Sequence, residues 1–100
     1  MLLVQGWVRF APETMPQFRA AGAKMIAETN REDGCLHYTF AEDVADPGLV
    51  LISERWRDQA AIDAHSKSAH MAEFLGAMGA MAPQGMDIRL YSGEEVQKIA

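Results

Sequence analysis

The chain of 100 residues is long enough for one hydrophobic core and too short for a second catalytic domain, so a single domain over residues 1–100 is predicted. Hydrophobic residues make up 49% and charged residues 23%, which is typical of a folded globular chain and excludes a disordered one. Nine basic and 14 acidic residues give a net charge of −5 without any basic block, which argues against nucleic acid binding.

Cysteine content and the first residues indicate the cellular setting. The single cysteine, Cys35, cannot form an internal disulfide, and no paired Cys and His spacing matches a structural zinc site. The apolar start at Met1–Val4 is interrupted by Gln5 and Arg9 before a signal-peptide core or a membrane span could form. A reducing, cytoplasmic setting without membrane association is therefore expected.

Alternation of apolar and polar residues predicts four β-strands. In residues 2–10, Leu2, Val4, Val8 and Phe10 fall on one side, and Gln5, Trp7 and Arg9 on the other. The same period of two predicts strands over residues 35–42, 49–56 and 86–91. A turn at Asp46-Pro47-Gly48 joins the second and third strands, which should therefore form a hairpin.

Spacings of three and four between apolar residues predict the helices. One helix should follow Pro12 and end near Asn30, and another should follow Ser68 and end before Pro83. Asp58 is expected to cap a short helix that runs through His65. The tail from residue 94 to residue 100 is predicted to form a helical turn or to fray.

The resulting order β-α-β-β-α-β predicts an α+β, ferredoxin-like fold with an antiparallel sheet and helices on one face. The other face of the sheet is left uncovered. The side chains expected there mix aromatic and charged types and include Trp7, Arg55, Arg89 and Tyr91. Such a mixed face is typical of a surface that receives a partner.

Five sequence pieces between residues 32 and 74 carry a family resemblance. They are Asp33-Gly34-Cys35-Leu36-His37-Tyr38, Glu54-Arg55-Trp56-Arg57-Asp58, Ala61-Ile62-Asp63-Ala64-His65, Ser68-Ala69-His70-Met71 and Phe74. The set resembles the antibiotic biosynthesis monooxygenase family. The resemblance implies a dimeric α+β barrel, in which two sheets of a homodimer pack face to face and each protomer holds a pocket between its sheet and its helices.

The same resemblance implies a range of activities. Characterised relatives oxygenate quinols and anthrones with O2 and without metal or flavin, whereas others degrade haem or have no known substrate. Haem-degrading relatives carry an asparagine on the first strand and an iron-ligating histidine on the last long helix, where this chain offers Gln5 and an apolar stretch around Leu75. Haem degradation is therefore disfavoured, although Gln5 could donate a hydrogen bond to a substrate carbonyl. The anthrone-oxidising relatives also use an asparagine, and the one present here, Asn30, lies near the predicted end of the first helix.

Oxygenation without a cofactor needs a base, an orienting hydrogen bond and apolar walls. His65 and His70 are candidate bases because imidazole titrates near neutral pH, and the alternative is that each bonds backbone groups at a helix junction. Five residues apart, the two do not share a helical face, and a shared metal would need a helix break that brings them to Glu54 or Asp63. No metal and no cofactor are predicted.

Glu54 and Tyr38 complete the predicted catalytic set. Glu54 interrupts an apolar strand face and could act as a base or orient His65 or Tyr38, or it could instead pair with an arginine across the sheet or the dimer seam. The Tyr38 hydroxyl needs either a neighbour or a substrate oxygen as its partner. The residues predicted to contact substrate are Trp56, Phe74, Met71, Met78 and Gln5, although the apolar ones could equally be core.

The predicted function is cofactor-independent oxidation of a small quinol-like or anthrone-like aromatic substrate by O2. The alternative is a non-catalytic, stress-related protein that binds an aromatic ligand in the same pocket. Both use the same apolar walls, so the sequence leaves both open.

Overall fold

The computed structural model describes residues 1–100 and contains the elements that the periodicities predict. In chain order they are β1 (Leu2–Arg9), a short 3-10 turn (Pro12–Thr14), α1 (Met15–Thr29), β2 (Cys35–Glu42), β3 (Leu49–Trp56), α2 (Gln59–Ser66), α3 (Ala69–Met81) and β4 (Gly85–Ser92). The ferredoxin-like α+β fold is thereby confirmed.

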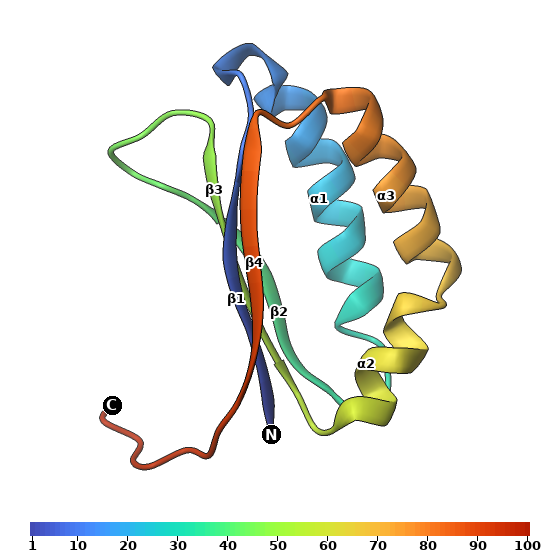
Figure 1. The fold of residues 1–100 in the computed structure, drawn as a ribbon, viewed down its shortest axis with the longest axis vertical. Coiled ribbons are helices and arrows are strands. Elements are labelled where there is room, and N and C mark those ends of the chain that lie inside the picture. The colour runs from blue at the N-terminus through green and yellow to red at the C-terminus, as the bar shows by residue number, and fades with distance from the viewer.

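The four strands form one antiparallel sheet in the order β2-β3-β1-β4. All three helices lie on the same side of this sheet, and the opposite side is open (Figure 1). The open face carries Trp7, which is 38% exposed, Leu51, which is 42% exposed, and Tyr91, which is 48% exposed. A face on which exposed aromatic and aliphatic side chains lie among polar ones is typical of a partner-binding surface.

Side-chain caps separate the second and third helices. The Asp58 carboxylate accepts a hydrogen bond from the Ala61 N–H at 2.9 Å, which confirms the predicted cap of α2. The Ser68 hydroxyl accepts one from the Met71 N–H at 3.2 Å and starts α3. Because two residues separate the end of α2 from the start of α3, the chain can bend at this junction, and it places His65 and His70 close together.

The core fills the space between the sheet and the helices. Its buried residues come from the inward side of the strands and from α1, and include Val8, Phe10, Met15, Phe18, Met25, Val50, Ile52 and Trp56. No helix covers β4, so the residues on its helix-facing side, Met86, Ile88 and Leu90, stay about half exposed. Residues 93–100 have no regular secondary structure, which agrees with a frayed tail rather than with the alternative of a helical turn, and they extend away from the domain (Figure 1).

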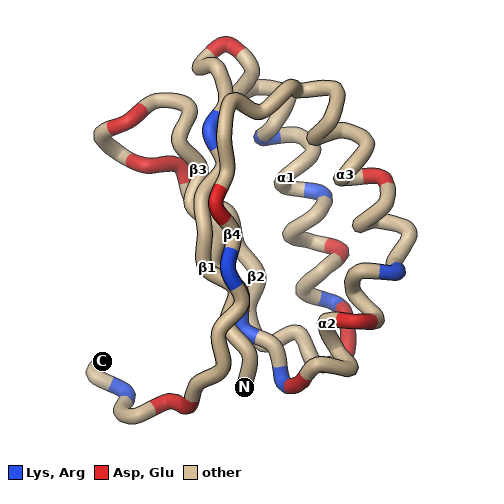
Figure 2. The backbone as a smooth tube through the Cα atoms, in the orientation of Figure 1, with Lys and Arg blue, Asp and Glu red and all other residues tan.

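Basic and acidic residues are both spread over the helices, whereas the loop between β2 and β3 carries acidic residues (Figure 2). Most of the ion pairs join partly or fully exposed side chains, such as Arg19 with Glu42 and Lys24 with Glu73. Exposed pairs of this kind contribute little to stability. None of the helices combines the length and the apolarity that crossing a membrane requires.

The loop between β2 and β3 depends on a glycine. Gly48 has a φ of +90°, and a Cβ built there would lie 2.3 Å from the Phe10 carbonyl oxygen. We expect Gly48→Ala to lower the free energy of unfolding by roughly 1–3 kcal/mol, because a side chain is strained in this conformation. The measurement is urea unfolding of the purified variant.

Gly76→Ala is the matched control, because Gly76 lies within α3 and no atom lies inside 4 Å of the added Cβ. This change should raise the free energy of unfolding by up to about 1 kcal/mol. Equal effects of the two changes would contradict this account.

Candidate functional site

An apolar cavity of about 200 Å³ lies between the sheet and α3. Eleven of its 12 lining residues are hydrophobic, and they are Val8, Phe18, Tyr38, Phe40, Ile52, Met71, Phe74, Leu75, Met78, Met86 and Ile88. Leu75, Met86 and Ile88 are at least half exposed and form the outer part of the lining. The cavity therefore opens beside β4, at the edge that no helix covers.

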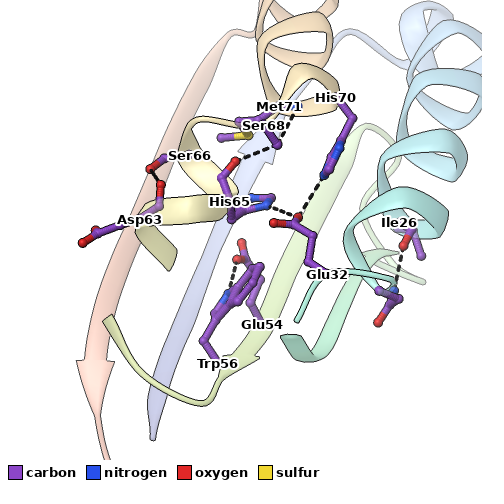
Figure 3. Close-up of polar contacts among 11 residues, drawn as sticks. Ile26, Glu32, Glu54, Trp56, Asp63, His65, Ser66, Ser68, His70 and Met71 are labelled. Carbon is purple, nitrogen blue, oxygen red and sulfur yellow. Dashed lines mark hydrogen bonds and ion pairs between the residues drawn. The ribbon is translucent and has the colours of Figure 1, made fainter. Parts of the chain in front are cut away.

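Glu54 is the twelfth lining residue and the only charged group in the cavity wall. It lies on β3 directly opposite Tyr38 on β2. Its Oε1 accepts a hydrogen bond of 2.8 Å from the Trp56 indole N–H, as Figure 3 shows, and it forms no ion pair. Burial raises the pKa of Glu54 above its ordinary value, and the bond from Trp56 only partly opposes this.

Tyr38 supplies the second polar group of the cavity wall. Its side chain is buried, and its ring packs edge-on against Phe40 and Trp56. Burial, reinforced by the negative charge of Glu54, raises the pKa of the phenol well above its usual range. The Tyr38 hydroxyl therefore stays protonated and can donate a hydrogen bond to a molecule in the cavity.

Glu32, His65 and His70 form a second polar cluster. Glu32 lies in the loop between α1 and β2, His65 in the last turn of α2, and His70 in the first turn of α3. The Glu32 Oε2 atom lies 2.6 Å from His65 Nδ1 and 2.9 Å from His70 Nε2 (Figure 3). Because both rings are bonded to a carboxylate, the prediction that they bond backbone groups at the junction is wrong.

His65 lies between Glu32 and the polar residues of the cavity wall, Tyr38 and Glu54, but it does not line the cavity itself. Its ring centroid lies 4.8 Å from that of Trp56 and 5.6 Å from that of Tyr38. Its charged form would lower the pKa of Glu54. His70 lies farther out and lines a small hollow between α1 and α3.

The structure thus gathers most of the predicted site residues in one place. Tyr38, Glu54, Met71, Phe74 and Met78 line the cavity, and Trp56 holds Glu54 from behind.

Two predictions about the site fail. Gln5 lies on the open face of the sheet, where its amide bonds the Ser53 hydroxyl, so it cannot reach this cavity. Glu54 pairs with the Trp56 indole rather than with an arginine.

Glu32 is the functional candidate that the sequence analysis missed. The metal alternative considered Glu54 or Asp63 as the partner of the two histidines, but the Asp63 carboxylate accepts a bond from Gln59 instead. Glu32 lies 33 residues before His65 in the chain, so no helical spacing points to it. One local indication in the sequence was that Glu32 directly precedes the Asp33-Gly34 turn. This turn leads into β2 of the β2–β3 hairpin, and the fold brings it close to the junction of α2 and α3.

The family resemblance can be tested against known proteins. A model of the family described as antibiotic biosynthesis monooxygenase matches residues 1–77. The chain belongs to this family. The match covers β1 through most of α3 and therefore includes both the cavity wall on these elements and the Glu32 cluster.

Individual proteins are similar to this chain in fold or in sequence. A Deinococcus radiodurans structure described as a "putative antibiotic biosynthesis monooxygenase" has a TM-score of 0.91 and 26% identity, and it covers 100% of this chain and 99% of that chain. A Mycobacterium tuberculosis protein named "Putative monooxygenase Rv0793" is 35% identical over 68% of this chain and 66% of its own length. The Bacillus subtilis protein named "Putative monooxygenase YcnE" is 25% identical over 75% of this chain and 79% of its own length.

Proposed function

We propose that this chain is a cofactor-independent monooxygenase that oxidises a small quinol-like or anthrone-like aromatic substrate with O2. One observation carries the proposal: a single carboxyl group without a cationic partner ends an otherwise apolar cavity, next to a protonated phenol. The family match supports an oxygenase, because its members bear monooxygenase names.

The proposed reaction begins with proton transfer from a substrate hydroxyl to Glu54. Its raised pKa makes the carboxylate a stronger base, and the bond from Trp56 fixes its orientation. Tyr38 donates a hydrogen bond to a substrate oxygen and stabilises the resulting anion. Of the four residues predicted to be catalytic, Glu54 and Tyr38 can touch a molecule in the cavity, so we assign the base to Glu54 rather than to His65 or His70.

The deprotonated quinol can then reduce O2 itself. One oxygen atom bonds to a ring carbon, and the other leaves as water with two hydrogens that come from the substrate. One quinol and one O2 thus give one hydroxyquinone and one water, and no external reductant is consumed. The protein's part is to hold the anion in an apolar, water-poor cavity.

The volume of the cavity favours small substrates. An apolar cavity of about 150 Å³ is enough to hold benzene. The 200 Å³ found here can therefore take one or two fused rings, and a three-ring anthrone would extend through the opening beside β4.

Oxygen uptake with a panel of quinols and anthrones tests the proposal. Each substrate is measured with and without a chelator, and against a blank that lacks protein. We expect acceleration that survives the chelator and is greatest for one-ring and two-ring quinols. Tight binding without acceleration of any panel member would instead support the alternative, a non-catalytic protein that binds aromatic ligands.

We also propose that the working unit is a homodimer with the two open sheet faces packed together. The exposed apolar side chains Trp7 and Leu51 on that face support this arrangement.

We expect Leu51→Lys to produce a monomer in sedimentation or light scattering, because the lysine would bury a charge in the interface. Val44→Lys, in the exposed loop after β2, is the control and should stay dimeric. A dimeric Leu51→Lys variant would contradict this interface.

A further inference from the structure

The Glu32 cluster has a carboxylate that is largely shielded from water and whose side-chain partners are two histidine rings. The Glu32 side chain is 15% exposed, and its ion-pair partners are the rings of His65 and His70. The nearby cation Arg57 is bound to Asp33 and Asp58, and Arg31 pairs with Glu28. No lysine or arginine pairs with Glu32, and buried carboxylates in proteins are normally paired or bound to metal.

The three side chains also meet the geometric needs of a metal ion. Their ligand atoms all lie within 4.8 Å of one another. Two atoms bound to one ion at about 2.0–2.2 Å lie roughly 3.3–3.6 Å apart in a tetrahedral site. Glu32 lies 2.6 and 2.9 Å from the two rings, so when an ion enters, the carboxylate must move outward and the two ring nitrogens must adjust to this spacing.

Each ligand comes from a different element, and each element is anchored nearby. The Ser68 hydroxyl donates to the His65 carbonyl oxygen at 2.7 Å and also caps α3, which carries His70. The Cys35 N–H donates to the Glu32 carbonyl oxygen at 3.2 Å, where the chain enters β2. The backbone around all three ligands is therefore fixed before any ion arrives.

We propose that Glu32, His65 and His70 form a binding site for a divalent transition-metal ion of the zinc or iron(II) class. Two imidazole nitrogens and one carboxylate oxygen suit these ions better than Mg²⁺ or Ca²⁺, which prefer oxygen ligands alone. The nitrogens that now face Glu32, His65 Nδ1 and His70 Nε2, would bind the ion as lone-pair donors, and each ring proton would move to its far nitrogen.

The site lies beside the substrate cavity and not in it. None of the three ligands lines the cavity, but the His65 ring touches Trp56 and Tyr38, and α3 carries both His70 and the cavity residues Met71 and Phe74. The bound ion would tie the loop before β2 to α2 and α3. Its role is therefore to stabilise the junction of these three segments, and the oxidation proposed above does not pass through it.

Zinc binding to the chelator-treated protein tests this site. We expect isothermal titration to give one zinc ion per chain, and a thermal melt to shift upward with zinc. His70→Ala should lose this ion, with an affinity lower by more than the roughly 10–100-fold that outer-shell changes cost. The third histidine of the chain, His37 on β2, offers the matched control, and His37→Ala should bind zinc as the unchanged protein does.

Two further measurements keep the test decisive. Glu32→Gln preserves the shape of the side chain and one hydrogen bond, so it should stay folded while losing zinc affinity and the zinc-dependent shift in melting temperature. Cobalt(II) in place of zinc should give visible absorption bands that disappear in both cluster variants. Absence of stoichiometric binding, or binding that His37→Ala removes and His70→Ala leaves intact, would overturn the site. Oxygen uptake is measured separately, so failure of the metal site and failure of the oxygenase proposal are distinguishable.

Discussion

Glu54→Gln is expected to lower the turnover of quinol oxidation by about 10²–10⁴-fold, the typical contribution of a positioned base. The amide cannot accept the substrate proton, but its carbonyl oxygen can still accept the hydrogen bond from the Trp56 indole. The cavity should therefore keep its shape and still bind substrate, so that the Michaelis constant changes little while turnover falls. The measurement is initial-rate oxygen uptake, with a ligand-binding titration on the same variant.

The pH dependence of the oxidation rate, measured for the unchanged enzyme and for Glu54→Gln, distinguishes a catalytic base from a purely structural carboxyl group. Because only the carboxylate accepts a proton, the rate of the unchanged enzyme should rise as the pH passes upward through the raised pKa of Glu54. The residual rate of Glu54→Gln should lack this step. Turnover that Glu54→Gln leaves unchanged would remove Glu54 from the mechanism.

The same pKa shift has a consequence for stability. Folding raises the pKa of Glu54 above its unfolded value near 4.5, so the folded state binds the proton more tightly. This contribution is fully present below the unfolded pKa and is lost as pH rises through the folded pKa. Glu54→Gln stays neutral throughout. We therefore subtract the melting temperature of the unchanged protein from that of Glu54→Gln. This difference should be larger at pH 8 than at pH 4.

Met78→Trp is expected to close the cavity and block substrate binding, raising the Michaelis constant at least about tenfold, which corresponds to ~1.4 kcal/mol. Met78 lines the cavity from α3, and the larger indole can extend into the 200 Å³ of empty space. Overpacking normally costs roughly 1–3 kcal/mol, but a side chain that fills a cavity should avoid most of that cost. Steady-state kinetics and a denaturant melt measure the two effects.

Ala80→Trp is the control for this change. Ala80 lies on the same helix with its side chain exposed, so the added indole stays outside the cavity. Its kinetics should match those of the unchanged enzyme. If Met78→Trp binds substrate as tightly as Ala80→Trp, the substrate does not occupy this cavity.

Local patterns were sufficient to predict the fold. The alternation in residues 2–10, the Asp58 cap, the helix start after Ser68 and the turn at Gly48 each depend on neighbours a few residues away, and the structure confirms all of them. In the tail after residue 92, Gly93 and Glu94 bond Met1, but Val96 and Ile99 are almost fully exposed, so weak helical preference is not reinforced by burial.

The site was only partly predictable because it depends on long-range contacts. Strand alternation placed Tyr38 and Glu54 on the inward face, and the structure shows them opposite each other. The same alternation put Gln5 on the outward side, and only the family resemblance suggested a substrate contact for it. The partner of Glu54 and the role of Glu32 depended on side-chain directions at a helix junction, which periodicity does not specify.

Oxidation of a two-ring quinol under isotopically labelled O2 tests the central claim most directly, since it follows each oxygen atom to its product. We predict one labelled atom in the hydroxyquinone and one in water, at a rate that chelator treatment leaves intact and that Glu54→Gln lowers by about 10²–10⁴-fold. Quinone without label, with all labelled oxygen recovered as hydrogen peroxide or left unreacted, would contradict an oxygenase.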